Sequence, residues 1–230
     1  YQENDMCKSL LTKLLPTYQK TIDKKWELLL GETNDNKDWL YEAIKNHPVY
    51  KSTFLTYFGK DTTKGYWSDD VVRPKKHTAE TLGPLANRFK TQIRCSDLID
   101  PAIYNQTFYT AMIETTIHND FAMFSEKEAK PIVAKRPFVI FGSCGQLKAF
   151  RSLGFKTFAP VIDESYDDEP DYYKRIMMIL DAMEKLSKRD PKEVYKELYP
   201  VLEHNYKHFY NNKWNSKLQK AWLTPNLLIE

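Results

Sequence analysis

Glycine and cysteine are both scarce in this sequence. Seven glycines among 230 residues leave no glycine-rich linker and argue against a low-complexity chain. The three cysteines, Cys7, Cys95 and Cys144, are odd in number, widely spread and include no C-x-x-C pair. Neither a disulfide framework nor a zinc knuckle is therefore indicated, and reduced thiols in a cytosolic compartment fit best.

Long apolar runs are absent as well. No stretch approaches the roughly eighteen apolar residues that a membrane-spanning helix needs. The N-terminal stretch YQENDMCKSL has neither the basic nor the apolar region of a signal peptide. It also lacks an initiator methionine, which suggests a trimmed or incomplete chain. We expect a protein without a membrane span, located in the cytoplasm, or in the host cytoplasm if it is viral.

The composition is that of a soluble globular protein, with 42% apolar and 28% charged residues. A net charge of +3 is too small to identify a nucleic-acid-binding protein by itself. A short basic cluster, Arg73 to His77, is interpreted first as a solvated loop. Contact between this cluster and a phosphate or a DNA acceptor is the alternative.

The N-terminal part predicts a βαβ unit. The apolar run Trp26 to Leu30 reads as a strand that ends at Gly31, and a polar turn over residues 32–36 follows it. Trp39 to Lys45 has helical apolar spacing, and Ser52 to Phe58 is rich in Thr, Phe and Tyr. Strands connected in this way are normally parallel, with a right-handed crossover.

The centre of the chain predicts a helix, a buried strand, a small-residue turn and a second helix. Ser125 is a good N-cap, and Glu128 completes a capping box with it. The unbroken apolar run Phe138 to Phe141 is typical of a strand buried on both faces. The turn Gly142 to Gly145 then leads into a helix from Gln146 to Leu153. This order is typical of a nucleotide site at the carboxyl edge of a sheet.

Lys127 is an unusual residue in the first turn of the Ser125 helix. Its positive charge opposes the helix dipole, whose N-terminal end is already positive. A bound anion would remove this cost, because free backbone N–H groups and a lysine together form a phosphate site. The sequence therefore predicts an anion beside Lys127.

Two helices are predicted towards the C-terminus. Tyr172 to Leu186 carries methionine and aromatic side chains at helical spacing, which indicates core packing. Asp190 begins a further helix that runs towards Tyr210. His204 and His208 lie four residues apart on it, but without a third ligand they are interpreted as surface residues rather than a metal site.

The order of the central motifs resembles the donor-binding domain of GT-B glycosyltransferases, and within them the fucosyltransferase-like group with its viral and bacterial relatives. The resemblance covers roughly residues 100 to 185 well and residues 25 to 60 faintly. It is carried by S-E-K at 125–127, P-F and an apolar strand to Gly142, L-K at 147–148, G-F-K-T-F at 154–158 and D-E-S-Y-D at 163–167.

The resemblance implies an α/β fold of two Rossmann-like halves in a GT-B-like arrangement, with the N-terminal half reduced. Residues 1–95 would form the acceptor-side domain. Residues 96–230 would form the nucleotide-sugar-binding domain with its C-terminal helices.

The implied activity is transfer of a hexose or pentose from a nucleotide-sugar donor, with no metal and no further cofactor. By resemblance, Glu126 bonds the donor ribose and Lys127 meets the pyrophosphate. The acidic segment, Asp163 to Tyr166, is expected to contact sugar hydroxyls or to cap a helix. The adjoining Asp167, Asp168, Glu169 and Asp171 are interpreted as a solvated helix start. The full set of expected donor-binding residues is Glu114, Thr115, Ser125, Glu126, Lys127, Lys130, Gly142, Ser143, Gly145, Asp163, Glu164, Ser165 and Tyr166.

An inverting transfer needs a carboxylate base within hydrogen-bond reach of the acceptor hydroxyl. Related sequences are expected to carry a Pro-His-Arg-Asp-like segment after Leu-Leu-Gly. Here the segment reads D-N-K-D, so the His and Arg are replaced, and Asp35 and Asp38 are the remaining candidates for the base. This departure supports a second hypothesis, in which the chain is a non-catalytic structural or binding module that keeps the fold.

The acceptor stays open between a glycan, a protein and a modified base in DNA. A base acceptor would have to be flipped out of its duplex. Ligands of open α/β sheets bind beyond the carboxyl ends of the strands. We therefore expect the Cα atoms of Glu114, Lys127 and Ser143 to lie within about 15 Å of one another, since neighbouring strands are about 4.8 Å apart.

Overall fold

The computed structural model describes residues 24–30, 34–57, 67–68, 71–72, 104, 107–114, 117 and 121–211. Gly31, Thr115, the basic cluster at 73–77 and the expected domain boundary at 95/96 lie outside these residues. For Glu126 only the backbone is described.

A four-stranded parallel sheet, in the order β2-β1-β5-β6, forms the centre of the fold. Its strands are short and mostly apolar, so that both faces are buried against helices. This confirms the predicted α/β class and the parallel pairing. The strands are β1 (Trp26–Leu29), β2 (Thr53–Thr56), β5 (Tyr109–Ile113) and β6 (Phe138–Phe141), and a separate antiparallel pair is formed by β3 (Trp67–Ser68) and β4 (Val71–Val72).

The predicted βαβ unit is present as β1, α2 (Asp35–Lys45) and β2, with the short 3-10 helix η1 (Pro48–Ser52) before β2. The helix begins four residues earlier than the apolar spacing indicated. Asn34 is its N-cap, with a side chain that accepts a hydrogen bond from the backbone N–H of Lys37 at 2.9 Å. Asp35 and Asp38 therefore lie in the first turn of α2, where acidic residues are favoured by the helix dipole, and not in an open loop.

The strands expected in two separate halves lie side by side in this one sheet. Trp26 of β1 is the partner of Tyr109 of β5, and their rings are 5.0 Å apart between centroids. The described residues thus form a single parallel sheet with one main core, and two Rossmann-like halves are not seen among them. Pairing β1 with β5 places both strands at the centre of the sheet, where each is hydrogen-bonded on both sides.

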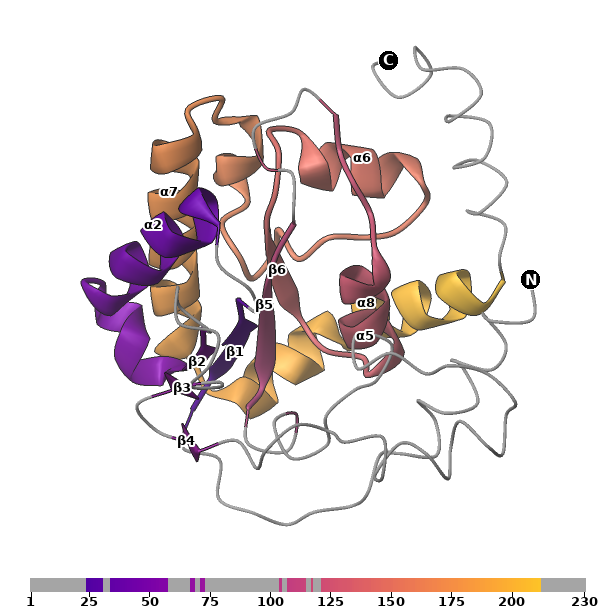
Figure 1. The fold of residues 1–230 in the computed structure, drawn as a ribbon. Helices are drawn as coiled ribbons and strands as arrows, with labels where there is room; N and C mark the ends of the chain where they lie inside the picture. Colours follow the sequence, from indigo (N-terminus) through magenta and orange to yellow (C-terminus); the bar gives the residue numbers. More distant parts are fainter. Residues whose placement is uncertain are drawn as a thin grey trace, which may run out of the picture.

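Helices cover the sheet from opposite sides, with α2 and α7 (Tyr172–Ser187) on one side and α5 (Glu126–Val133) and α6 (Gln146–Ser152) on the other (Figure 1). The indole Nε1 of Trp26 donates to the carbonyl of Met183 at 3.1 Å, which attaches β1 directly to α7. On the opposite side the Phe138 ring meets the rings of Phe150 and Phe158 at 5.8 and 5.0 Å. The core stripe predicted for the Tyr172 helix is confirmed for Ile176, Leu180 and Met183, which are almost completely buried, but is wrong for Tyr173 and Met177, which are exposed.

The last described helix, α8 (Pro191–Tyr210), contacts the sheet near its start and α5 farther along. Near its start Tyr195 stacks on Tyr109, and farther along it packs against α5. It begins at Asp190 as predicted, with the Asp190 side chain accepting from the N–H of Lys192. No described helix, α8 included, is long and apolar enough to cross a membrane.

Candidate functional site at the carboxyl edge of the sheet

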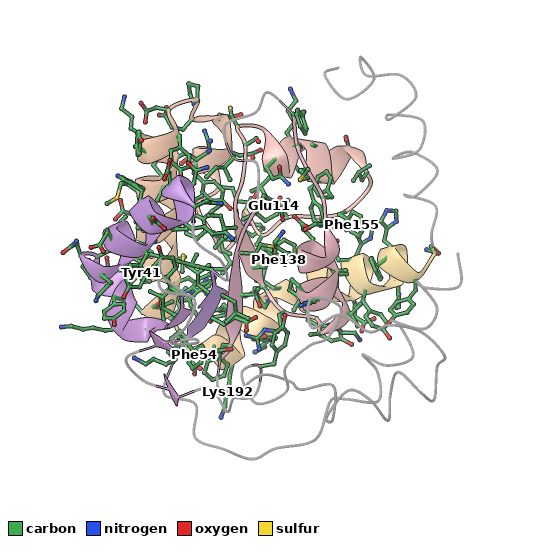
Figure 2. The ribbon with its side chains drawn as sticks, viewed as in Figure 1. Tyr41, Phe54, Glu114, Phe138, Phe155 and Lys192 are labelled. Atoms are coloured by element: carbon green, nitrogen blue, oxygen red, sulfur yellow. The ribbon has the colours of Figure 1, made fainter. Side chains whose placement is uncertain are left out.

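The ends of β5 and β6 meet the start of α5 at the carboxyl edge of the sheet. The backbone N–H of Glu114 donates to the carbonyl of Phe141 at 3.0 Å, so the two strands end side by side. Figure 2 shows Glu114 at this end of the sheet, above Phe138. The side chain of Glu114 reaches across to Ser125 and Lys127 at the start of α5.

These contacts confirm that Glu114, Lys127 and the Gly142 turn lie on one edge. Lys127 touches Glu114 directly, and Ser143 is two residues beyond the Phe141 carbonyl that Glu114 contacts. Two residues of extended chain span only about 7 Å. The contacts thus bring Glu114 close to Lys127 and to the turn, whereas the expected separation of all three Cα atoms stays a prediction.

Glu114 is a buried carboxylate, with 1% of its surface exposed. Its Oε1 lies 3.1 Å from the Ser125 Oγ, and its Oε2 lies 3.4 Å from the Lys127 Nζ. The Lys127 side chain is 33% exposed, so the ion pair joins a buried anion to a cation that also faces solvent. An exposed ion pair contributes little to stability, whereas a buried carboxylate depends strongly on its partner.

The predicted capping box at the start of α5 is confirmed. The Ser125 N–H donates to Glu128 Oε2 at 2.8 Å, and the Ser125 Oγ accepts from the Lys127 N–H at 3.4 Å. Lys127 stands in the first turn as the sequence indicated. The negative charge beside it in the structure is the Glu114 carboxylate of the chain itself, and a bound phosphate at this position stays a prediction.

Glu128 is an unusual member of this group, because it is 3% exposed and its Oε1 has no hydrogen-bond partner. Burial, and after it the charge of Glu114, raises the pKa of Glu128 well above its usual value. Lys130, one turn farther along α5, acts electrostatically on Glu27 elsewhere in the core.

The turn after β6 is tightly built. Gly145 has φ +77°, a conformation that favours glycine, and a Cβ at Gly142 would lie 3.0 Å from Gln146 Cγ. Ser143 is buried, whereas Cys144 is exposed. The main-chain carbonyl of Gly142 accepts from the Arg175 Nε at 3.0 Å, which fixes the turn to α7.

The start of α6 is occupied by an acidic side chain of the protein. Asp167 accepts from the N–H groups of Leu147 and Lys148 at 2.7 and 2.8 Å, and its carbonyl accepts from Gly145 N at 2.7 Å. The sequence interpretation of Asp167 as part of a solvated helix start is wrong, because it is 3% exposed. The amides expected to cradle a phosphate here already bind a carboxylate, so α5 provides the more open helix start.

The rest of the acidic segment shapes the loop. The short helix η3 (Ser165–Asp168) follows Glu164, whose Oε1 accepts from the Phe158 N–H at 2.6 Å. Burial raises the pKa of Glu164. Asp163 and Ser165 are exposed and bonded to each other at 2.7 Å, and Tyr166 is buried. Helix capping, predicted for Asp163 to Tyr166, is carried out instead by Asp167, which caps α6, and by Asp171, which is the N-cap of α7.

Of the two candidate base residues, Asp35 is exposed and Asp38 is partly buried. The Asp38 carboxylate accepts from the Tyr57 hydroxyl. The Tyr172 hydroxyl donates to the Asn36 carbonyl at 3.4 Å, which brings the starts of α2 and α7 together. No described contact joins either aspartate to Glu114 or Lys127.

Arg175 is a site residue that sequence reasoning missed. Its guanidinium is 3% exposed and donates to the carbonyls of Gly142, Ile117, Glu169 and Pro170 at 2.6 to 3.3 Å. It thereby ties three loops at the carboxyl edge to one helix. The sequence offered no signal for this role, because a single arginine beside a core stripe is usually an exposed residue.

A second buried polar group lies on the sheet itself. Glu27 of β1 accepts from the Thr110 hydroxyl at 2.7 Å, and Thr110 also accepts from the Arg136 Nε at 3.2 Å. Arg136 further donates to the carbonyls of Tyr104 and Tyr109. Burial raises the pKa of Glu27, an effect that the charge of Arg136 opposes.

One described cluster has the composition of a metal site. His47, Asp181 and Glu184 place their ligand atoms within 4.8 Å of one another. The Nδ1 of His47, however, accepts from the Val49 N–H at 3.2 Å, which puts the ring proton on Nε2, directed at Asp181. A metal-binding histidine almost always donates through its second nitrogen. The cluster is therefore better described as a hydrogen bond between η1 and α7.

The histidines of α8 are not simple surface residues, contrary to the sequence interpretation. His204 Nε2 lies 2.9 Å from the Gly154 carbonyl, and His208 Nε2 lies 2.9 Å from the Leu153 carbonyl. Between them, Asn205 bonds both the N–H and the carbonyl of Lys156 at 2.8 Å. Together these side chains hold the end of α6 against α8.

Comparison with known proteins adds no relative, since no family model, curated protein or solved structure matches the chain.

Proposed function

We propose that the chain binds the diphosphate of a nucleotide sugar beside Lys127 and transfers the sugar to an acceptor. One observation carries the proposal: the partly exposed Lys127 ammonium stands in the first turn of α5, at the carboxyl edge of a parallel sheet. Backbone N–H groups and a cation at a helix start favour phosphate, and this edge is where open α/β sheets bind ligands.

In this proposal the chemistry depends on charge that develops on the leaving diphosphate. Lys127 and the positive end of the α5 dipole would stabilise that charge, without a metal. Glu126 would bond the donor ribose, as the resemblance implies. The acceptor would be a glycan, a protein or a modified DNA base, with Asp35 as the better candidate for the base because Asp38 already accepts from Tyr57.

The proposal includes a modified form of the GT-B-like arrangement. Residues 1–95 would remain the acceptor side and residues 96–230 the donor side. Since β1 pairs with β5, the reduced N-terminal part would contribute its strands to the donor-side sheet and would not form a second sheet from these strands.

The test is the binding of GDP, UDP and ADP to Lys127→Ala, measured by calorimetry. Loss of one charge-assisted hydrogen bond costs about 1.5–3 kcal/mol, so we expect binding to weaken by about 10- to 100-fold. Lys188→Ala is the matched control, because Lys188 lies at the far end of α7 and pairs with Glu184. Binding to Lys127→Ala that equals the wild type would rule out the proposed site.

A non-catalytic binding module is the second candidate. It is favoured by the contacts that already satisfy the charges at this edge, with Glu114 beside Lys127 and Asp167 at the start of α6. A donor-hydrolysis assay with a panel of nucleotide sugars separates the two hypotheses. Slow release of a nucleoside diphosphate supports the enzyme, and absence of release with every donor that binds supports the module.

A further inference from the structure

At the start of α5, two carboxyl groups and one ammonium surround the hydroxyl oxygen of Ser125. The Ser125 Oγ lies 3.1 Å from Glu114 Oε1, 3.4 Å from Glu128 Oε2 and 3.2 Å from Lys127 Nζ. Both glutamates are at least 97% buried, whereas Lys127 is partly exposed. Two buried carboxylates beside one lysine would leave an uncompensated negative charge.

The hydrogen bonds show how this charge is removed. Glu128 Oε2 accepts from the Ser125 N–H at 2.8 Å, whereas Glu128 Oε1 is buried with no donor directed at it. The neighbour of Glu128 is the Glu114 side chain. A proton on Glu128 Oε1 lets it donate to the Glu114 carboxylate, which satisfies the unpartnered atom and leaves one negative charge opposite one lysine.

We propose that Glu114 and Glu128 share one proton and that the Glu114 carboxylate is the counter-ion of Lys127. A bound phosphate displaces this carboxylate from Lys127, and the pair of glutamates then takes up a second proton. The proposal rests on the proposed function in one respect, namely that the anion binds at Lys127. The second proton comes from solvent, and no covalent bond is made or broken.

Among the described residues, Lys127 is the cation observed in contact with the pair, at 3.4 Å from Glu114 Oε2. Lys130 acts on Glu27, and Lys135, just beyond the end of α5, pairs with Glu203 of α8. Neither β5 nor β6 carries another charged residue. A phosphate that draws the Lys127 ammonium away therefore leaves a buried carboxylate without its cation, and protonation removes the cost.

The experiment measures binding of inorganic sulfate, which stays doubly charged throughout, between pH 6 and pH 8. For the wild type we expect affinity to rise as pH falls, by up to about tenfold per pH unit for one linked proton. Glu114→Gln removes the counter-ion and should bind more tightly than the wild type at pH 8, with little pH dependence. Glu193→Gln, an exposed change on α8, is the charge-matched control and should behave as the wild type does.

A ligand-free measurement tests the shared proton separately. Glu128→Gln imitates a neutral acid, so it should match wild-type stability near pH 5. At pH 8 it should be more stable than the wild type, because folded wild-type protein must either hold a proton on the glutamate pair or bury a second negative charge, and both lower its free energy of unfolding. A variant that is less stable than the wild type at pH 8 would overturn proton sharing, provided that circular dichroism shows the native fold at pH 5.

The outcomes separate this inference from the proposed function. Weaker sulfate binding by Glu114→Gln at pH 8, an unchanged pH slope, or no sulfate binding by either protein at pH 6 overturns the coupling. Nucleoside diphosphate binding that depends on Lys127 would then still support the function. Proton-linked sulfate binding without any nucleoside diphosphate binding would support the coupling and reject the function.

Discussion

The carboxylate of Asp167 caps a helix that starts twenty-one residues earlier in the chain, at Gln146, with its two oxygens 2.7 and 2.8 Å from the N–H groups of Leu147 and Lys148. A capping side chain usually comes from the residue just before the helix, but here that residue is Gly145, which has no side chain to offer. The cap therefore connects the acidic segment to the turn after β6. It also neutralises the positive end of α6, and for this reason we propose the start of α5 as the place for a ligand anion.

Asp167→Ala is predicted to lower the free energy of unfolding by about 2–3 kcal/mol, because two charge-assisted hydrogen bonds to backbone N–H groups are lost and the Leu147 N–H stays buried. Asp168→Ala is the control, since Asp168 is the exposed neighbour and its loss should stay within about 0.5 kcal/mol. Urea denaturation of both variants measures the difference. Equal losses would show that the Asp167 contacts contribute nothing specific.

Arg175→Lys is predicted to cost about 2–4 kcal/mol although it keeps the charge. A guanidinium can donate in several fixed directions, whereas an ammonium on a flexible stem cannot reach the same four carbonyls, so some remain buried without a donor. Because one of these carbonyls belongs to Gly142, the loss should also disturb the carboxyl edge.

Thermal unfolding and hydrogen exchange check this prediction for Arg175→Lys. Exchange should accelerate in the turn after β6 more than in α8, which Arg175 does not contact in its described hydrogen bonds. Lys174→Arg, an exposed change on the next residue, is the control. Uniform exchange across the chain in Arg175→Lys would contradict a local role.

The elements that the sequence predicted best are those whose signals are local. The Ser125 cap with Glu128 and the apolar run Phe138 to Phe141 both lie within a few residues of the structure that they specify. The start of α2 was placed too late, because apolar spacing begins at Trp39 while the Asn34 cap precedes it. Periodicity locates the buried face of a helix, but caps locate its ends.

The site could be located only in part for the same reason. Strand ends and a helix start are local signals, and from them the sequence correctly predicted that Glu114 and Lys127 lie at one edge of the sheet. The partner of Lys127 depends on how far apart β5 and α5 lie, which no spacing in the sequence encodes. Arg175 and Asp167 act over long separations in the chain, and in the sequence each resembles an ordinary charged residue.

Zinc is predicted to leave the thermal stability unchanged at the cluster of His47, Asp181 and Glu184. Binding through His47 Nε2 would require its ring proton to move to Nδ1, where it would oppose the Val49 N–H. A thermal-shift series with zinc, compared between the wild type and Asp181→Asn, measures this. A rise in Tm that Asp181→Asn removes would contradict the hydrogen-bond assignment and establish a metal site.

Glu27→Gln is predicted to weaken the pH dependence of stability above the ordinary carboxyl pKa. Burial raises the pKa of Glu27, so from pH 4.5 upwards the unfolded chain releases this proton while the folded chain retains it. The unfolded state then binds fewer protons, and stability must fall as pH rises towards the folded pKa. Glu128 and Glu164 contribute in the same direction, since burial also raises their pKa values.

The measurement is the free energy of unfolding in urea at intervals from pH 4 to pH 8. The wild type should lose stability over this range, and Glu27→Gln should lose less, because an amide has no proton to release and can still accept from Thr110. Glu197→Gln, at the surface of α8 beside Arg189, is the control and should follow the wild-type slope closely. If Glu27→Gln kept the full wild-type slope, the Arg136 charge, which acts against burial at Glu27, would be the stronger of the two effects.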